Sequence, residues 1–185
     1  MAKKKKPTLD REIVLPEGVS AVFQDDTLTI KGPKGEASKK LSHKKVKVSI
    51  DGKSIKISSE LMTQREKKLI GSFAAHALNL IRGVENPHLY MLKICSGHFP
   101  MNVSVSGDKF IIKNFIGEKV PRTLAIKKGA TVKVEGDTIT VESPSKEIAG
   151  QVSADIEQLT RRVNFDTRIF QDGIYITSKS GKELK

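Results

Sequence analysis

The chain has 185 residues, of which 37% are apolar, and its 33 Lys and Arg residues against 21 Asp and Glu residues give a net charge of +12. This length suits one large or two small domains with packed cores, and no apolar run approaches the roughly 20 residues that a membrane-spanning helix needs. The single cysteine, Cys95, excludes an internal disulfide, and we expect a cytoplasmic protein in a reducing compartment, without a signal peptide.

The basic excess predicts a polyanionic partner, and nucleic acid is the commonest one. Residues 1–90 hold 18 basic and 10 acidic residues, whereas residues 91–185 hold 15 and 11, so the first half is the more basic. Aromatic residues make up only 5% of the chain, and there is no tryptophan. This scarcity argues against platforms that stack single-stranded bases, and it favours recognition of the nucleic-acid backbone and shape.

In chain order, the first feature is a lysine run at residues 3–6, which is either a solvated arm or an arm that orders on RNA. The second is IKGPKGE, Ile30 to Glu36, whose two glycines and flanking lysines raise the question of a phosphate-binding loop. A P-loop needs GxxxxGK[ST] before a helix, and that pattern is absent here. We therefore expect a turn between strands, with Lys34 as at most a secondary contact.

Three segments then recur in the second half of the chain. TLTIKGPKGE (27–36) aligns with KFIIKNFIGE (109–118), and VSIDGKSIKISSE (48–60) aligns with VKVEGDTITVESP (132–144), each pair alternating apolar and polar residues. Asp51-Gly52 and Gly136-Asp137 have the turn chemistry of a hairpin. Residues 69–84 and 148–163 place their apolar side chains on one arc of a helical wheel.

The repeat predicts an α+β protein of two duplicated domains, each an antiparallel sheet packed with one main helix. We expect a basic arm at residues 1–8, a first repeat at 9–85, a second repeat at 86–177, and a basic tail at 178–185. Gly83 and Pro87 interrupt the helical pattern and mark the boundary between the repeats.

Catalytic and metal-binding motifs are missing from the sequence. The four histidines have no Cys or His partners at metal-ligand spacing, and no nucleophile motif occurs. Cys95 follows an alternating stretch and is expected to be a buried strand residue. We expect no enzyme, no cofactor, no metal and no small-molecule substrate.

The C-terminal stretch contains arginines at the expected end of the second helix, where cations favour the helix dipole, and then further basic residues. Basic residues at such an edge can bind phosphate groups. The same residues are also typical of an edge that is only exposed to water.

The stretch QLTRRVNFDTRIFQDGIYI (158–176) resembles the C-terminal signature of the ribosomal protein L6 family in its archaeal and eukaryotic branch. IKGPKGE, GSFAAHALNLIRGV (71–84) and HLYMLKICSGHFPMNV (88–103) also resemble that family. The resemblance implies a structural constituent of the large ribosomal subunit that binds 23S-type rRNA near the sarcin–ricin loop and the translation-factor site. The implied partners are large-subunit rRNA, neighbouring ribosomal proteins and, indirectly, translation GTPases.

In the family the second domain makes the main rRNA contacts, which carries over to eight residues of this sequence: Lys146, Arg161, Arg162, Arg168, Gln171, Gly173, Lys179 and Lys182. Five lysines are candidates for secondary contacts: Lys3, Lys4, Lys5, Lys6 and Lys34. A free architectural or regulatory nucleic-acid-binding protein is the alternative, because such a protein would use the same basic residues to bind a nucleic acid outside the ribosome.

Overall fold

The computed structural model describes residues 9–59, 63–166 and 168–184. The chain divides into two compact units, Met1–Pro87 and His88–Lys185, each with its own hydrophobic core. The lysine run at residues 3–6 lies outside the described residues.

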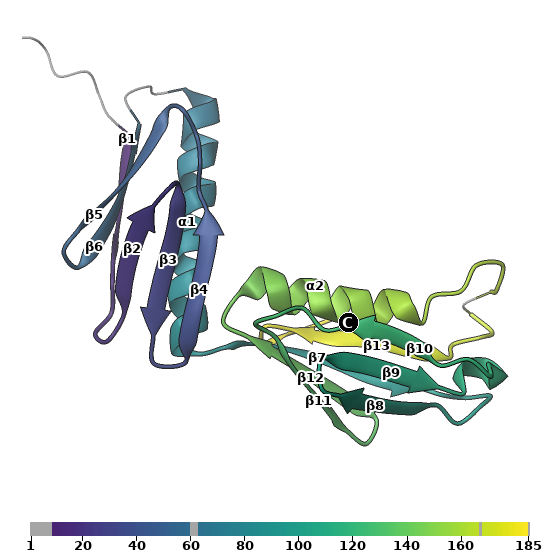
Figure 1. Ribbon diagram of the computed structural model, residues 1–185. Coiled ribbons are helices and arrows are strands. Elements are labelled where there is room, and N and C mark those ends of the chain that lie inside the picture. Colours follow the sequence, from purple (N-terminus) through teal and green to yellow (C-terminus); the bar gives the residue numbers. More distant parts are fainter. Residues whose placement is uncertain (1–8, 60–62, 167, 185) are drawn as a thin grey trace, which may run out of the picture. The chain divides into compact units, whose positions relative to one another are not determined.

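The first unit contains two three-stranded antiparallel sheets and one helix (Figure 1). One sheet has the order β1-β6-β5 and the other the order β2-β3-β4. The elements are β1 (Leu9–Val14), β2 (Ser20–Gln24), β3 (Thr27–Gly32), β4 (Gly35–Lys40), β5 (Val46–Asp51), β6 (Ser54–Ser59) and α1 (Gln64–Glu85). The alternating strands turn their apolar side chains to the same core as the apolar stripe of α1, which contacts strands of both sheets.

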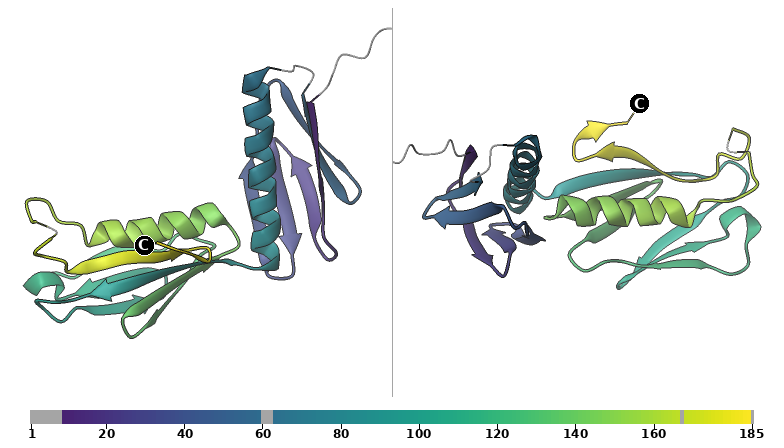
Figure 2. Two further views of the ribbon diagram at one scale, coloured as in Figure 1. Left: turned by 180° about the vertical axis from the view of Figure 1, so that it is seen from behind. Right: turned by 90° about the horizontal axis from the view of Figure 1, so that it is seen from above.

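The second unit repeats this plan with a larger sheet. The order is β11-β12-β7-β13-β14 in one sheet and β10-β9-β8 in the other. The elements are β7 (His88–Cys95), β8 (Asn102–Ser106), β9 (Lys109–Lys113), the short 3-10 helix η1 (Phe115–Gly117), β10 (Arg122–Ala125), β11 (Thr131–Glu135), β12 (Thr138–Ser143), α2 (Lys146–Leu159), β13 (Gly173–Lys179) and β14 (Lys182–Glu183). In both views of Figure 2, α2 lies along one face of the large sheet.

The predicted duplicated α+β fold is confirmed, because β1-β6-β5 corresponds to β7-β12-β11 and β2-β3-β4 corresponds to β8-β9-β10. In the part of the chain that the structure describes, six strands precede the helix in each unit, whereas the repeated segments aligned in the sequence predict strand, strand, loop, strand, strand, helix. Among the described residues of the first unit, the hairpin β13-β14 has no counterpart, and it occupies part of the segment expected to be a basic tail.

The predicted second helix, residues 148–163, was too long at its C-terminal end. α2 ends at Leu159, and Val163, which was placed on its apolar arc, is 83% exposed. The helix stops because Thr160 leaves the helical conformation and its hydroxyl accepts a hydrogen bond from the Ile174 amide at 3.0 Å. A tertiary contact with β13 therefore replaces the next helical turn.

The IKGPKGE segment forms the predicted turn, a tight connection between β3 and β4 in which Gly32 pairs with Gly35. The turn packs on the end of α1, since the Lys34 amide donates to the Val84 carbonyl at 3.0 Å and the Lys34 Nζ donates to Asn86 Oδ1 at 3.2 Å. A β-carbon on Gly32 would lie 2.8 Å from Val84 Cγ2. This glycine is needed for close packing, so the loop has a structural explanation without any phosphate.

We expect Gly32→Ala to lower the free energy of unfolding by about 1–3 kcal/mol, because the added methyl group overpacks the contact with Val84. Gly71→Ala is the matched control: Gly71 lies within α1, and a β-carbon added there would have no neighbouring atom within 4 Å. That substitution should stabilise the protein by about 0.5–1 kcal/mol. Urea denaturation of the full chain measures both, and equal effects of the two substitutions would show that the Gly32 contact relaxes without cost.

Candidate nucleic-acid interface

The structure distributes the predicted RNA-binding residues over two ends of the second unit. Arg161, Arg162, Arg168 and Gln171 lie in residues 160–166 and 168–172, which we call the arginine loop, just beyond the C-terminal end of α2. Lys146 begins α2, so the 14-residue helix separates it from the arginine loop by about 21 Å. The predicted residues therefore form two groups rather than one.

The second group consists of Lys146, Lys179 and Lys182, all of which are exposed. Lys179 pairs with Tyr90 at the start of β7 and with Lys182 across the β13-β14 turn. The Tyr90 hydroxyl in turn lies 3.3 Å from the position of a β-carbon on Gly150, in the first half of α2. These lysines thus lie towards the N-terminal end of α2.

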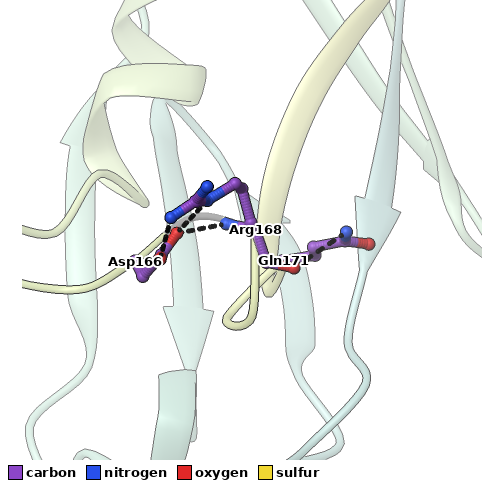
Figure 3. A network of polar contacts seen from close by, with 3 residues as sticks. All are labelled: Asp166, Arg168 and Gln171. Carbon is purple, nitrogen blue, oxygen red and sulfur yellow. Dashed lines mark hydrogen bonds and ion pairs between the residues drawn. The ribbon is translucent and has the colours of Figure 1, made fainter.

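Arg168 makes a forked ion pair within the arginine loop (Figure 3). Its Nε donates to Asp166 Oδ1 at 3.1 Å, and its Nη2 donates to Asp166 Oδ2 at 2.9 Å. The hydrogen bonds from Arg168 lower the pKa of the Asp166 carboxyl below its usual value. The Arg168 side chain nevertheless remains 89% exposed, so a phosphate can approach it, although in competition with Asp166.

Gln171 and Gly173 have contacts within the protein. Gln171 Nε2 donates to the Arg168 carbonyl at 3.4 Å, which closes the loop on itself (Figure 3). Gly173 begins β13, and a β-carbon there would lie 3.3 Å from both the Thr160 and the Tyr175 hydroxyl oxygens. Gly173 therefore permits the close approach of β13 to the end of α2.

A row of aromatic rings in contact holds the arginine loop against the segment after β7. The Arg162 guanidinium lies 4.0 Å above the centre of the Phe165 ring. Phe165 meets Phe170 edge-on at 5.2 Å, and Phe170 lies 5.0 Å from the His98 ring. Sequence reasoning had assigned none of these three rings to the site, because no local pattern relates position 98 to position 170.

His98 completes the row by pairing with the buried carboxylate of Asp172. The His98 amide donates to Asp172 Oδ1 at 2.9 Å, and its ring nitrogen Nδ1 contacts Asp172 Oδ2. Burial raises the pKa of Asp172, but the hydrogen bonds from His98 and Gly97 outweigh it, so the pKa lies below its usual value. The carboxylate is thereby held in its charged form and ties the end of the loop to the scaffold.

The cation at the C-terminal end of α2 is Arg122 from β10, whereas the sequence pattern had assigned that role to Arg161 and Arg162. Its Nη1 donates to the Leu159 carbonyl at 2.5 Å, while Nε and Nη2 donate to the two carboxylate oxygens of Glu118 at 2.8 and 2.6 Å. The guanidinium also lies 4.4 Å above the Phe115 ring. Since Arg122 satisfies the helix end, Arg161 and Arg162 are not required there.

The remaining candidates lie outside these two groups of residues. Lys34 bonds to Asn86 as described above, and Lys3, Lys4, Lys5 and Lys6 lie outside the described residues. Cys95 ends β7 and is only partly buried, contrary to the expectation of a buried residue.

Among residues 9–59, 63–166 and 168–184, no group of three or more His, Cys, Asp or Glu side chains could hold a metal ion. In the same ranges, no helix is long and apolar enough to span a bilayer.

A duplicated α+β fold with exposed arginines on one loop has the features expected of a basic nucleic-acid-binding protein. Comparison with known families makes this specific: the model of the family described as ribosomal protein L6 matches residues 15–86 and 99–173. The chain belongs to the ribosomal protein L6 family. The two matched stretches fall in the two units.

Relatives named large ribosomal subunit protein uL6 align over nearly the whole chain. The protein of Nanoarchaeum equitans is 40% identical over 96% of this chain and 97% of the relative. Those of Haloquadratum walsbyi and Halobacterium salinarum are 42% and 39% identical, over 90% and 92% of this chain and 94% and 96% of the relatives. These archaeal matches confirm the resemblance seen in the sequence. They also confirm the expectation of a structural ribosomal protein and not an enzyme.

Proposed function

We propose that the protein is a structural constituent of the large ribosomal subunit and binds 23S-type rRNA chiefly through its second unit. Its place is near the sarcin–ricin loop and the translation-factor site, with neighbouring ribosomal proteins as partners and translation GTPases as indirect ones. Family membership supports the ribosomal role. The finer location rests on the family resemblance of residues 158–176.

The arginine loop is the observation that carries the RNA-binding part of the proposal. Three arginines lie within eight residues, and the loop that bears them is tied down by the Phe165–Phe170–His98 row and by Asp172. A braced loop has less conformational freedom to lose on binding than a mobile one. Guanidinium groups can bridge two phosphate oxygens in a fixed geometry, which suits a structural contact with folded RNA.

Co-sedimentation through a sucrose gradient at high salt tests the ribosomal role. The protein should travel with large subunits, because contacts that include oriented arginines and shape recognition resist salt better than diffuse charge attraction. A free architectural nucleic-acid-binding protein would stay at the top of the gradient. Crosslinks from the arginine loop to rRNA test the location, and crosslinks confined to rRNA far from the sarcin–ricin loop would contradict it.

A further inference from the structure

We propose that a pocket at the C-terminal end of α2 receives one unstacked nucleobase of the bound RNA, while the arginines at its rim hold the flanking phosphates. The inference rests on the proposed function and adds the chemical group that the site recognises. It also adds a mode of recognition that the low aromatic content of the chain argued against.

The pocket has a volume of about 370 Å³ and lies between the end of α2, the arginine loop and the start of β13. This is within the range of sites that bind small organic groups. Apolar and aromatic side chains form part of its lining, namely Ile116, Phe165, Phe170 and Tyr175. Arg161 and Arg162 also line it, so cationic and aromatic groups share one cavity.

Three of the nine aromatic residues of the chain line this one pocket. Phe165 and Tyr175 are each 39% exposed, although large apolar side chains are normally buried. The Arg162 guanidinium lies over the Phe165 ring at 4.0 Å, and guanidinium planes and aromatic rings are the surfaces on which splayed-out RNA bases stack. Although aromatic residues make up only 5% of the chain, they are concentrated at this pocket, where a base can stack.

The charges around the pocket favour RNA over an acidic peptide or a neutral ligand. Its two carboxylates are already engaged within the protein: Glu157 Oε1 accepts from the Ile176 amide at 3.2 Å, and Asp172 is held by His98. The nearby Glu118 carboxylate is paired with Arg122. The positive charge of Arg161 and Arg162 is thus directed at a ligand that brings both a flat ring and negative charge, and a nucleotide has both.

The pocket can also read the edge of a base. Gln158 is exposed on the last turn of α2, and its side-chain amide has both donor and acceptor atoms. The Thr160 hydroxyl, by contrast, is engaged with the Ile174 amide and the Glu157 carbonyl. We therefore assign stacking to Phe165 and Tyr175, and edge contacts to Gln158.

The test uses the full chain, large-subunit rRNA, and filter binding across a salt series. Phe165→Leu removes the ring while it keeps an apolar side chain of similar size, and Tyr175→Leu does the same on β13. Phe99→Leu is the matched control, because Phe99 is an aromatic residue of the same unit, 46% exposed, that does not line the pocket. Circular dichroism checks that all three variants are folded.

Loss of a stacked base should weaken binding roughly 5- to 100-fold in the Phe165 and Tyr175 variants and leave the Phe99 variant unchanged. In the Tyr175 variant the slope of log affinity against log salt should stay at its wild-type value, because Tyr175 takes no part in the Arg162–Phe165–Phe170 contacts and no phosphate contact is removed. A variant that merely loosened the arginine loop would lower the magnitude of that slope as well. Wild-type affinity in both pocket variants would overturn the inference.

Ultraviolet crosslinking followed by mass spectrometry supplies an independent measurement. In the wild-type complex a nucleotide should be recovered on the peptide that contains Phe165 and Phe170. RNA binding with crosslinked nucleotides only elsewhere would overturn the base pocket and leave the proposed function standing. Failure of the wild-type protein to bind large-subunit rRNA at all would instead overturn the proposed function.

Discussion

Replacing Arg161, Arg162 and Arg168 together by alanine is expected to weaken binding to large-subunit rRNA more than deletion of Lys3–Lys6 does. The deletion removes more positive charge than the substitutions do. Affinity, however, depends on how many phosphates are contacted by side chains held in a fixed geometry. Arginine presents a planar fork that matches phosphate geometry, whereas lysine is a point charge on a stem with high rotamer entropy. The ring contact of Arg162 and the bracing of the loop add to this difference.

A filter-binding salt titration measures the effect. Each lost phosphate contact should lower the magnitude of the log-affinity against log-salt slope by roughly 0.7 to 0.9. Arg168 should contribute least of the three, because Asp166 competes for its guanidinium. The triple variant Lys146→Ala/Lys179→Ala/Lys182→Ala removes the same amount of charge from the other end of the unit. It should weaken binding less than the triple arginine variant does. If the arm deletion proves the most damaging, the principal RNA contact lies in the first half of the chain.

Arg122→Met is expected to destabilise the second unit by about 2–4 kcal/mol. The substitution removes the hydrogen bond to the Leu159 carbonyl at the end of α2 and both hydrogen bonds to Glu118. Both side chains of the pair are less than one-third exposed, at 23% for Arg122 and 31% for Glu118, so water replaces these contacts only in part. Urea denaturation followed by circular dichroism measures the loss.

Two further variants separate the loss of the bidentate arginine contact from the cost of leaving the Glu118 carboxylate unpaired. Arg122→Lys keeps the charge but loses the fork, and full stability of this variant would refute the bidentate role. Arg122→Met/Glu118→Gln should regain part of the loss, because it removes the carboxylate that Arg122 leaves unpaired.

The pair also has a defined pH dependence. The hydrogen bond from Arg122 lowers the pKa of Glu118, against the opposing effect of burial. Its contribution is therefore complete above the ordinary pKa of a glutamate and is lost as the pH falls through the lowered value. The difference in stability between the wild type and Arg122→Met/Glu118→Gln should accordingly shrink in acid.

Much of the fold follows from local pattern in the sequence. Alternating apolar residues in 48–57 and 132–141, with glycines at the turns, correspond to the hairpins β5-β6 and β11-β12. Gly52 and Gly136 adopt the left-handed conformation, each with φ 58°, that such turns require. The apolar arc at 69–84 is the buried stripe of α1. These features depend on neighbours within a few residues, so the sequence alone contains them.

The arginines of the candidate site were visible in the sequence, but their setting was not. Contacts such as His98 with Asp172, 74 residues apart, and Arg122 with Leu159, 37 residues apart, leave no periodic trace in the chain. The same holds for the end of α2, where the bond between Thr160 and Ile174 outweighs an apolar pattern that continues to Val163. Sequence periodicity determined which residues could form strands and helices. Only long-range packing decided where α2 ends, which arginine caps it, and which aromatic rings gather beside Arg162.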